Sequence, residues 1–222
     1  MQGKEKNTSG GVMDRLFGMA EFCKVILILA CGYSFCFLFF MDQSIEGMNV
    51  FHRESTTSVS GLQHPVLYGI YLALIGFSLF LNIGHLSRRY QLRSKLVTVC
   101  QYVGLFALVA VALFKTNPER SGMSFYIHLA ASILYAVGNG FGAFFFTAFA
   151  KKRYPGFRPF FYGGIIFIVG TVTGFIIRLC GFMETVPMLI VLVALYMANF
   201  TNLVPPDPNN ETAGIEEAVR RG

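Results

Sequence analysis

The chain alternates between long apolar runs and short polar connectors. Each apolar run is continuous and close to the about 20 residues that an α-helix needs to cross the hydrocarbon core of a bilayer. Strands of a membrane barrel would instead alternate apolar and polar residues over about 10 positions. The pattern therefore predicts an all-α, polytopic membrane bundle of six transmembrane helices, at 24–41, 66–84, 96–114, 124–150, 160–179 and 185–203.

The remaining segments complete the predicted organisation. A polar N-terminal tail covers 1–23, with a short interfacial helix expected over 12–22. The transmembrane domain covers 24–204, and a polar C-terminal tail covers 205–222. The stretch 42–65 contains many Ser and Thr residues and is expected to form a loop. No separate soluble domain is expected, because no long polar segment is left for one.

Composition agrees with a membrane environment. The chain is 54% hydrophobic and 14% charged, whereas a soluble domain carries about 25% charged residues. Its mean hydropathy is +0.55. The net charge of +6 comes from short clusters between apolar runs. It therefore indicates orientation in a membrane, and nucleic acid is not expected as a partner.

The basic residues predict how the chain crosses the membrane. Lys and Arg prefer cytoplasmic loops close to the ends of spans. Most of the 18 Lys and Arg residues fall in the two tails and in the connectors 85–95 and 151–159. Lys24 directly follows the N-terminal tail and belongs to the same side, and the exceptions are Arg53, Lys115, Arg120 and Arg178. This bias places both termini in the cytoplasm.

Ionisable residues from several segments gather at the predicted outer boundary. A charged group at mid-depth costs at least roughly 2.5 kcal/mol, so such groups usually face a cavity or the bundle interior. His128 is the candidate catalytic residue, as a hydrogen-bond donor or as an acid/base. The candidate ligand-binding residues are Arg178, His64, Asp42 and Glu184. Among these, Arg178 is expected to hold a phosphate or carboxylate.

Structural alternatives stay open for the same residues. Arg178 and Glu184 lie close enough to the interface to reach lipid headgroups by snorkelling. His128 in the alternative reading makes only a structural hydrogen bond to a neighbouring helix, and His64 is a plain loop residue.

No metal or cofactor is expected. A catalytic zinc site needs three protein ligands, and only His64 and His128 are plausible, with Asp42 a distant third. His85 and His128 fall at opposite ends of their spans, so they cannot share a haem. The five cysteines show no CxxC spacing and are expected to be small buried hydrophobes.

Two sets of residues are expected at the membrane interfaces. A basic cluster is expected to contact anionic lipid headgroups on the inner side, and consists of Lys151, Lys152, Arg153 and Arg158. Because the chain has no Trp, tyrosines are expected to replace it in the interfacial belts, namely Tyr33, Tyr68, Tyr71, Tyr126 and Tyr162.

Glycines in the predicted fourth and fifth helices mark close helix contacts. Gly138 and Gly142 lie in the fourth helix, and Gly170 and Gly174 form a GxxxG pattern in the fifth. We expect these two helices to pack on each other. The alternative is that their glycines serve a homo-oligomer or a membrane protein partner.

Ile127-His128 near the start of the fourth helix and Arg178 near the end of the fifth carry a resemblance to a known family. With six spans, both termini inside and a polar loop after the first span, the chain resembles the family of the damage-regulated autophagy modulators and the Golgi GPI-anchor remodelling factor. The resemblance covers about 24–203. The chain departs from the family in a shorter first outer loop without that loop's cysteines. The resemblance implies a lipid-linked function, with membrane lipids as partners.

These observations leave three hypotheses. The first is an integral membrane protein whose outer-side cavity binds or acts on a lipid headgroup or acyl chain. The second is a non-enzymatic membrane scaffold or partner-binding subunit. The third, a small-solute transporter, lacks the internal repeats that transporters usually show.

Overall fold

The computed structural model describes residues 12–44, 51, 56–92, 94–114, 121–177 and 180–205. Within them the secondary structure is helical, and six helices are long and apolar enough to cross a membrane. These are α2 (Ala20–Ser44), α4 (Pro65–Arg89), α5 (Lys95–Leu113), α6 (Gly122–Arg153), α7 (Arg158–Ile177) and α8 (Gly181–Phe200). Three short elements accompany them: α1 (Val12–Gly18), α3 (Thr57–Gln63) and η1 (Pro155–Phe157). The predicted all-α bundle with six long helices is confirmed.

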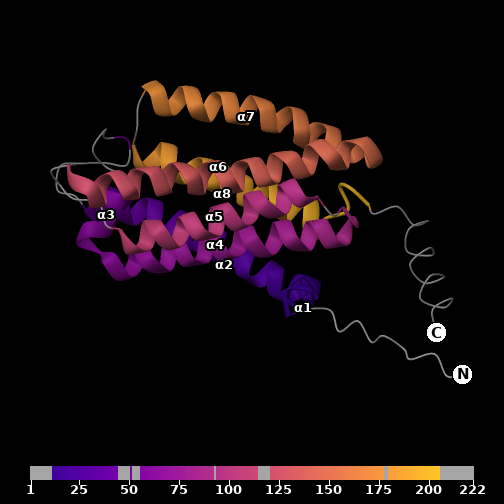
Figure 1. Cartoon of the computed structure of the whole chain (residues 1–222), viewed down its shortest axis with the longest axis horizontal. Coiled ribbons are helices and arrows are strands. Elements are labelled where there is room, and N and C mark those ends of the chain that lie inside the picture. The colour runs from indigo at the N-terminus through magenta and orange to yellow at the C-terminus, as the bar shows by residue number, and fades with distance from the viewer. Residues whose placement is uncertain are drawn as a thin grey trace, which may run out of the picture.

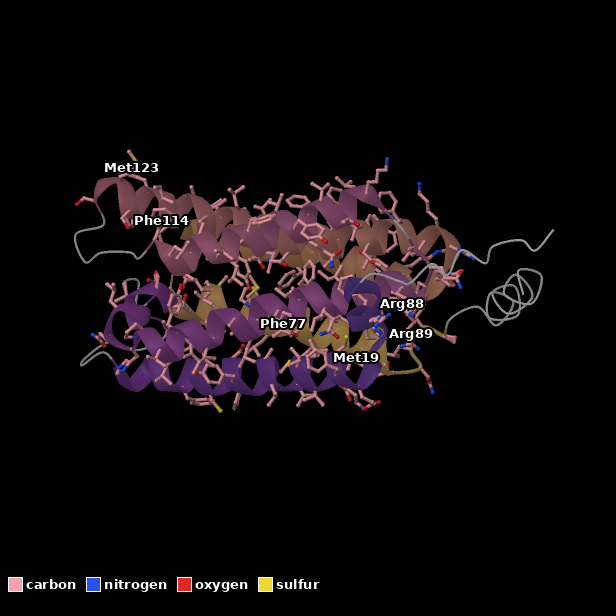
Figure 2. All side chains as sticks on the ribbon, turned by 60° about the horizontal axis from the view of Figure 1, so that its bottom comes forward. Met19, Phe77, Arg88, Arg89, Phe114 and Met123 are labelled. Atoms are coloured by element: carbon pink, nitrogen blue, oxygen red, sulfur yellow. The ribbon has the colours of Figure 1, made fainter. Side chains whose placement is uncertain are left out.

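The long helices run side by side along the length of the molecule (Figure 1). Figure 2 shows Phe114 and Met123 at one end of the bundle, which we call the Phe114 end. Arg88 and Arg89 lie toward the other end, which we call the Arg88 end. Helix α3 and the start of α6 lie at the Phe114 end, whereas α1 and the end of α8 lie toward the Arg88 end.

Three elements differ from the sequence prediction. The stretch 42–65, expected to be a loop, contains α3 over Thr57–Gln63. The interfacial helix expected over 12–22 ends at Gly18, and α2 begins two residues later. α4 and α6 continue into the basic connectors as far as Arg89 and Arg153. A helix does not end where polar side chains begin, because its backbone hydrogen bonds form within the helix both inside the membrane and beyond its boundary.

Helix α4 lies at the centre of the packing and contacts α2, α5, α6 and α8. Its buried apolar residues recur every three or four positions, as expected of a helix with a buried stripe: Leu72, Ile75, Leu79, Ile83 and Leu86. Gly76 gives the Leu108 side chain of α5 room against the α4 backbone. By contrast, α7 has no buried residue and lies at the edge of the bundle (Figure 1).

The most extensive helix contact joins α5 and α6. A Cβ atom on Gly138 would lie 2.7 Å from the backbone nitrogen of Gly104 and 2.9 Å from its Cα. The two backbones thus touch, which only glycine permits. The expected packing of α6 on α7 is present, with the Phe144 and Phe161 rings stacked, but Gly138 packs on α5. In α7, Gly164 faces Phe144 of α6, and Gly174 faces Met183 of α8.

Side-chain amides tie the apolar helices together. Asn82 of α4 donates to the Cys23 carbonyl of α2 at 3.2 Å, and Asn199 of α8 donates to the Asn82 carbonyl at 3.1 Å. Gln101 of α5 donates to the Phe80 carbonyl at 3.0 Å. Such bonds satisfy amides that would otherwise meet only hydrocarbon, and they connect α4 to three neighbours.

Tyr90 joins the ends of three segments at the Arg88 end. Its hydroxyl lies 2.5 Å from the Val204 carbonyl oxygen, and Tyr154 donates to the Tyr90 carbonyl at 3.2 Å. The Tyr90 ring packs edge-on against Phe146 and Phe157. Burial raises the pKa of Tyr90, so the phenol keeps its proton at neutral pH. Tyr90 therefore holds the end of α8 against the α4–α5 junction.

We expect Gly138→Ala to lower the unfolding free energy by about 1–3 kcal/mol, because the new methyl group meets backbone atoms that cannot rotate away. Gly140→Ala is the matched control, since nothing lies within 4 Å of a Cβ there. Thermal unfolding of both variants in detergent measures the difference. Equal melting temperatures for the two variants would show that α5 and α6 do not touch at Gly138.

Tyr90→Phe removes one hydroxyl and leaves the Val204 carbonyl without that donor. The expected loss of stability is about 1–3 kcal/mol, the usual range for a buried polar group left unsatisfied. Tyr102→Phe provides the control, because Tyr102 is exposed on α5. Thermal unfolding in detergent is again the measurement. A Tyr90→Phe protein as stable as this control contradicts the role given to the hydroxyl.

Candidate functional site

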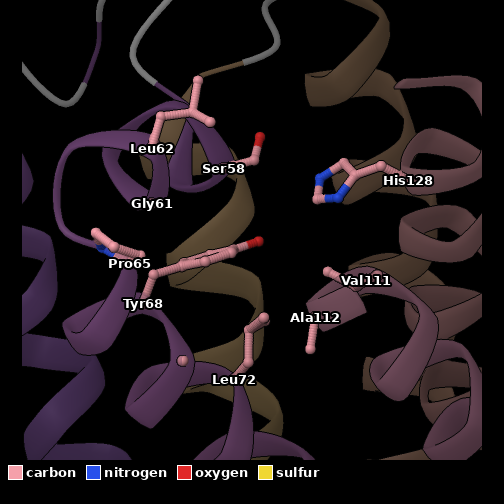
Figure 3. Close-up of a pocket in the computed structure, with 10 residues that line it drawn as sticks. Ser58, Gly61, Leu62, Pro65, Tyr68, Leu72, Val111, Ala112 and His128 are labelled. Carbon is pink, nitrogen blue, oxygen red and sulfur yellow. The ribbon is translucent and has the colours of Figure 1, made fainter. Parts of the chain in front are cut away.

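A small pocket of about 70 Å³ lies at the Phe114 end, between α3 and α4 on one side and α5 and α6 on the other (Figure 3). Apolar and small residues form most of its wall: Gly61, Leu62, Pro65, Gly69, Leu72, Val111 and Ala112. Three polar side chains line it as well, Ser58 from α3, Tyr68 from α4 and His128 from α6. Figure 3 shows all three directed into the space between the helices.

His128 is held by the end of α5. Its Nδ1 lies 2.6 Å from the carbonyl oxygen of Phe114, the residue that follows the last residue of α5. The last carbonyls of a helix lack partners within the helix, so the imidazole supplies a donor that α5 needs. A carbonyl oxygen only accepts hydrogen bonds, so Nδ1 carries the hydrogen, and the neutral ring keeps its lone pair on Nε2.

This contact fixes the direction of the imidazole ring. His128 is only 6% exposed, and its ring extends across the pocket toward Ser58 and Tyr68 (Figure 3). The pocket therefore receives a hydrogen-bond acceptor, Nε2, whose position depends on the bond made by the opposite nitrogen. Outer hydrogen bonds of this kind commonly orient functional histidines.

The Tyr68 ring rests against α3. A Cβ atom on Gly61 would come within 2.5 Å of the ring carbon Cδ1. Glycine is thus required at this position for the ring to lie flat against α3 and to bring its hydroxyl to the pocket (Figure 3). Ser58, one turn earlier in α3, lies with its hydroxyl 3.2 Å from that of Thr56.

Glu184 fixes α3 to α8. Its Oε2 accepts hydrogen bonds from the Thr57 backbone nitrogen at 2.6 Å and from the Thr57 hydroxyl at 2.7 Å. The carboxylate thereby satisfies donors in the first turn of α3, next to Ser58. Glu184 does not line the pocket, but it holds the helix that supplies one wall of it.

Two further hydroxyl groups are buried at this end of the bundle. Tyr135 lies on α6 two turns beyond His128 and on the same face. Its hydroxyl is buried and has no hydrogen-bond partner in the described structure, and the same holds for Thr185 Oγ1 of α8. Two hydroxyl groups therefore lie among the apolar side chains of the bundle interior.

The structure brings only part of the predicted site together. His128 lines the pocket, whereas His64 precedes α4 and is absent from the lining. Glu184 bonds to Thr57 of α3. Arg178 and the side chain of Asp42 lie outside the described residues. Within the described residues, no three His, Cys, Asp or Glu side chains are grouped as metal ligands.

The predicted inner lipid contacts lie at the Arg88 end. Lys151, Lys152 and Arg153 end α6, and Arg158 begins α7. Lys151 lies with Nζ 3.0 Å from the centre of the Phe161 ring. Arg153 also lies over an aromatic ring, with its guanidinium carbon 5.6 Å from the centre of the Tyr154 ring. The side chains of Lys152, Arg153 and Arg158 are exposed.

Sequence reasoning missed Ser58 and misplaced Tyr68. Ser58 lies in the stretch expected to be a loop. Tyr68 and Tyr71 were expected in an interfacial belt, but Tyr71 is buried in the core and Tyr68 lines the pocket. Tyr126 and Tyr162 are exposed as expected. The signal that favours a helix at 65 is Pro65, since proline is common at the first helical position. It places Tyr68 one turn into α4.

Comparison with known proteins adds no relative. No protein-family model, no curated protein and no solved structure matches this chain. The resemblance given by Ile127-His128 and Arg178 therefore stays a prediction.

Proposed function

We propose that this chain is an integral, multi-pass membrane protein that binds a membrane lipid in the pocket at the Phe114 end. The observation that carries the proposal is the orientation of His128, whose bond to the Phe114 carbonyl directs the opposite ring nitrogen into an otherwise mostly apolar pocket. A few convergent polar groups in an apolar pocket are typical of a small-molecule site.

The orientation in the membrane is part of the proposal. Basic residues gather at the Arg88 end, where α4 and α6 end in Arg88, Arg89 and the Lys151–Arg153 cluster. The preference of Lys and Arg for the cytoplasm assigns this end, and both termini, to the cytoplasmic side. The pocket then faces the outer leaflet.

A lipid suits this location better than a water-soluble ligand. The pocket lies at the end of helices whose outer surfaces are apolar, including the exposed Phe106 and Val109 of α5. A lipid in the outer leaflet would have its polar group at the depth of the pocket and its acyl chains beside the apolar helix surfaces. On the predicted outer side, Arg178 is available in sequence to hold a phosphate or carboxylate.

Conversion of the lipid is a narrower form of the proposal. Neutral His128 has a free lone pair on Nε2 for accepting a proton, while Nδ1–H bonded to a carbonyl holds the ring in place. Activity would then need lipid turnover that His128→Gln abolishes even at saturating lipid. Binding without turnover limits His128 to recognition.

Ala112→Phe tests lipid binding by filling the pocket from the α5 side. In nanodiscs doped separately with diazirine–alkyne analogues of phosphatidylcholine, diacylglycerol and a sterol, we expect photo-crosslinking of at least one probe to peptides of α3, α4 and α6 to fall by about tenfold. A blocked pocket leaves only non-specific contacts. The readout is mass spectrometry of the labelled peptides.

Val109→Phe is the matched control, because Val109 lies on the same helix and is 51% exposed away from the pocket. It should label like the wild-type protein. Equal labelling in the wild type, Ala112→Phe and Val109→Phe would mean that the pocket does not bind lipid.

A membrane scaffold is the second candidate function, and α7 favours it. No residue of this helix is buried, and a Cβ atom on Gly163 or Gly170 would have nothing within 4 Å. An apolar helix with small residues on an open face is suited to packing against a helix of another membrane protein or of a second copy.

Gly170→Ile tests this candidate. The larger side chain should abolish helix association through this face, with little change in the stability of the monomer. Gly140→Ile, on an open position of α6, is the control. Single-molecule subunit counting in bilayers, together with quantitative co-purification, measures association. If Gly170→Ile associates as the wild-type protein does, the α7 face is not a partner surface.

A further inference from the structure

We propose that the group bound in the pocket is an uncharged alcohol, the free hydroxyl of a neutral lipid such as a sterol or a diacylglycerol. This inference rests on the proposed lipid site and names the chemistry that the site recognises. Its evidence is the size of the pocket, the hydrogen-bonding character of its polar groups and the absence of charge in its lining.

The size of the pocket restricts what enters it. A volume of about 70 Å³ is far below the roughly 300–1,000 Å³ of a pocket that encloses a whole small molecule. Only a terminal group of the ligand fits, and the rest of the molecule lies outside, against the apolar helix surfaces. A bulky phosphodiester or sugar headgroup does not fit in this space.

The polar groups match an alcohol. Neutral His128 presents Nε2, which accepts a hydrogen bond. Across the pocket lie the hydroxyls of Tyr68, which interacts with Thr57, and of Ser58, which interacts with Thr56 (Figure 3). A hydroxyl can both donate and accept, so each retains capacity for a further hydrogen bond. An alcohol donates one hydrogen bond and accepts others, so one hydroxyl satisfies both walls. A carbonyl or a phosphate oxygen has no hydrogen to donate and leaves Nε2 without a partner.

The walls contain no charge to hold an ion. None of the described residues that line the pocket is Lys, Arg, Asp or Glu. Transfer of an unpaired charge into such a site is strongly unfavourable, whereas an uncharged hydroxyl is accommodated by the hydrogen bonds available. Leu62, Leu72 and Val111 then contact the carbon atoms next to that hydroxyl.

The experiment is a competition on the full chain in phosphatidylcholine nanodiscs. Diazirine–alkyne analogues of cholesterol and of diacylglycerol serve as two separate photo-crosslinking probes. Each is competed by its parent alcohol and by the methyl ether of that alcohol, which has the same skeleton without the hydroxyl hydrogen. We expect at least one alcohol to compete about fivefold to tenfold better than its ether, as one lost buried hydrogen bond predicts. The probe that responds identifies the source of the alcohol.

Two variants test whether the difference between alcohol and ether competition arises in the pocket. Tyr68→Phe removes one hydroxyl and keeps the ring against Gly61, and His128→Gln keeps an amide that can donate to the Phe114 carbonyl. Both should reduce the alcohol-to-ether ratio toward one, while Tyr126→Phe, at a position that is 61% exposed on α6, should leave it unchanged. If His128→Gln fails to fold, Tyr68→Phe and the ether comparison still decide the question.

The outcomes separate this inference from the proposed function. Equal competition by alcohol and ether, or stronger competition by phosphatidic acid than by either alcohol, overturns the alcohol assignment. If Ala112→Phe still blocks labelling by the phosphatidylcholine probe in that case, the lipid pocket stands and only its ligand chemistry is wrong. If no probe labels the pocket in a way that Ala112→Phe prevents, both proposals fail.

Discussion

The hydrogen bond from His128 to the Phe114 carbonyl is the interaction on which the candidate site depends. An apolar bundle offers no water to its backbone, so the free carbonyls at the end of α5 need donors from the protein. His128 supplies one at 2.6 Å, and this fixes both the tautomer of its ring and the direction of Nε2. The same contact links α5 to α6, whose backbones already touch at Gly104 and Gly138. Helix packing and site geometry therefore have a common origin.

The opposite wall of the pocket has an equally local cause. Glu184 binds the first turn of α3 through Thr57, and Gly61 lets the Tyr68 ring lie against that helix. The pocket thus forms between two packed pairs of helices, α5 with α6 and α3 with α4. Amide hydrogen bonds from Asn82, Asn199 and Gln101 hold the bundle around α4. Polar groups in this protein mostly serve assembly, and His128 serves assembly and the site together.

The six long helices were predictable because each is a continuous apolar run of nearly constant length. The place of His128 beside a cavity was predictable, because a polar ring inside such a run needs a partner or a cavity. α3 was not predictable: its seven residues, TSVSGLQ, carry no apolar period and depend on Glu184 from a distant helix. The partner of Gly138 and the place of Tyr68 also depend on which helices become neighbours, which spacing along one helix does not specify.

Solid-state ¹⁵N NMR of the histidine side chains in lipid bilayers tests the central claim most directly. With His128 assigned through the His128→Gln variant, the account predicts at neutral pH a protonated Nδ1 in a hydrogen bond and an unprotonated Nε2. A ring protonated on Nε2 alone, or one that exchanges freely between tautomers, would contradict it. The imidazole would then not be held by the Phe114 carbonyl, and the pocket would lack the fixed acceptor on which the proposed recognition depends.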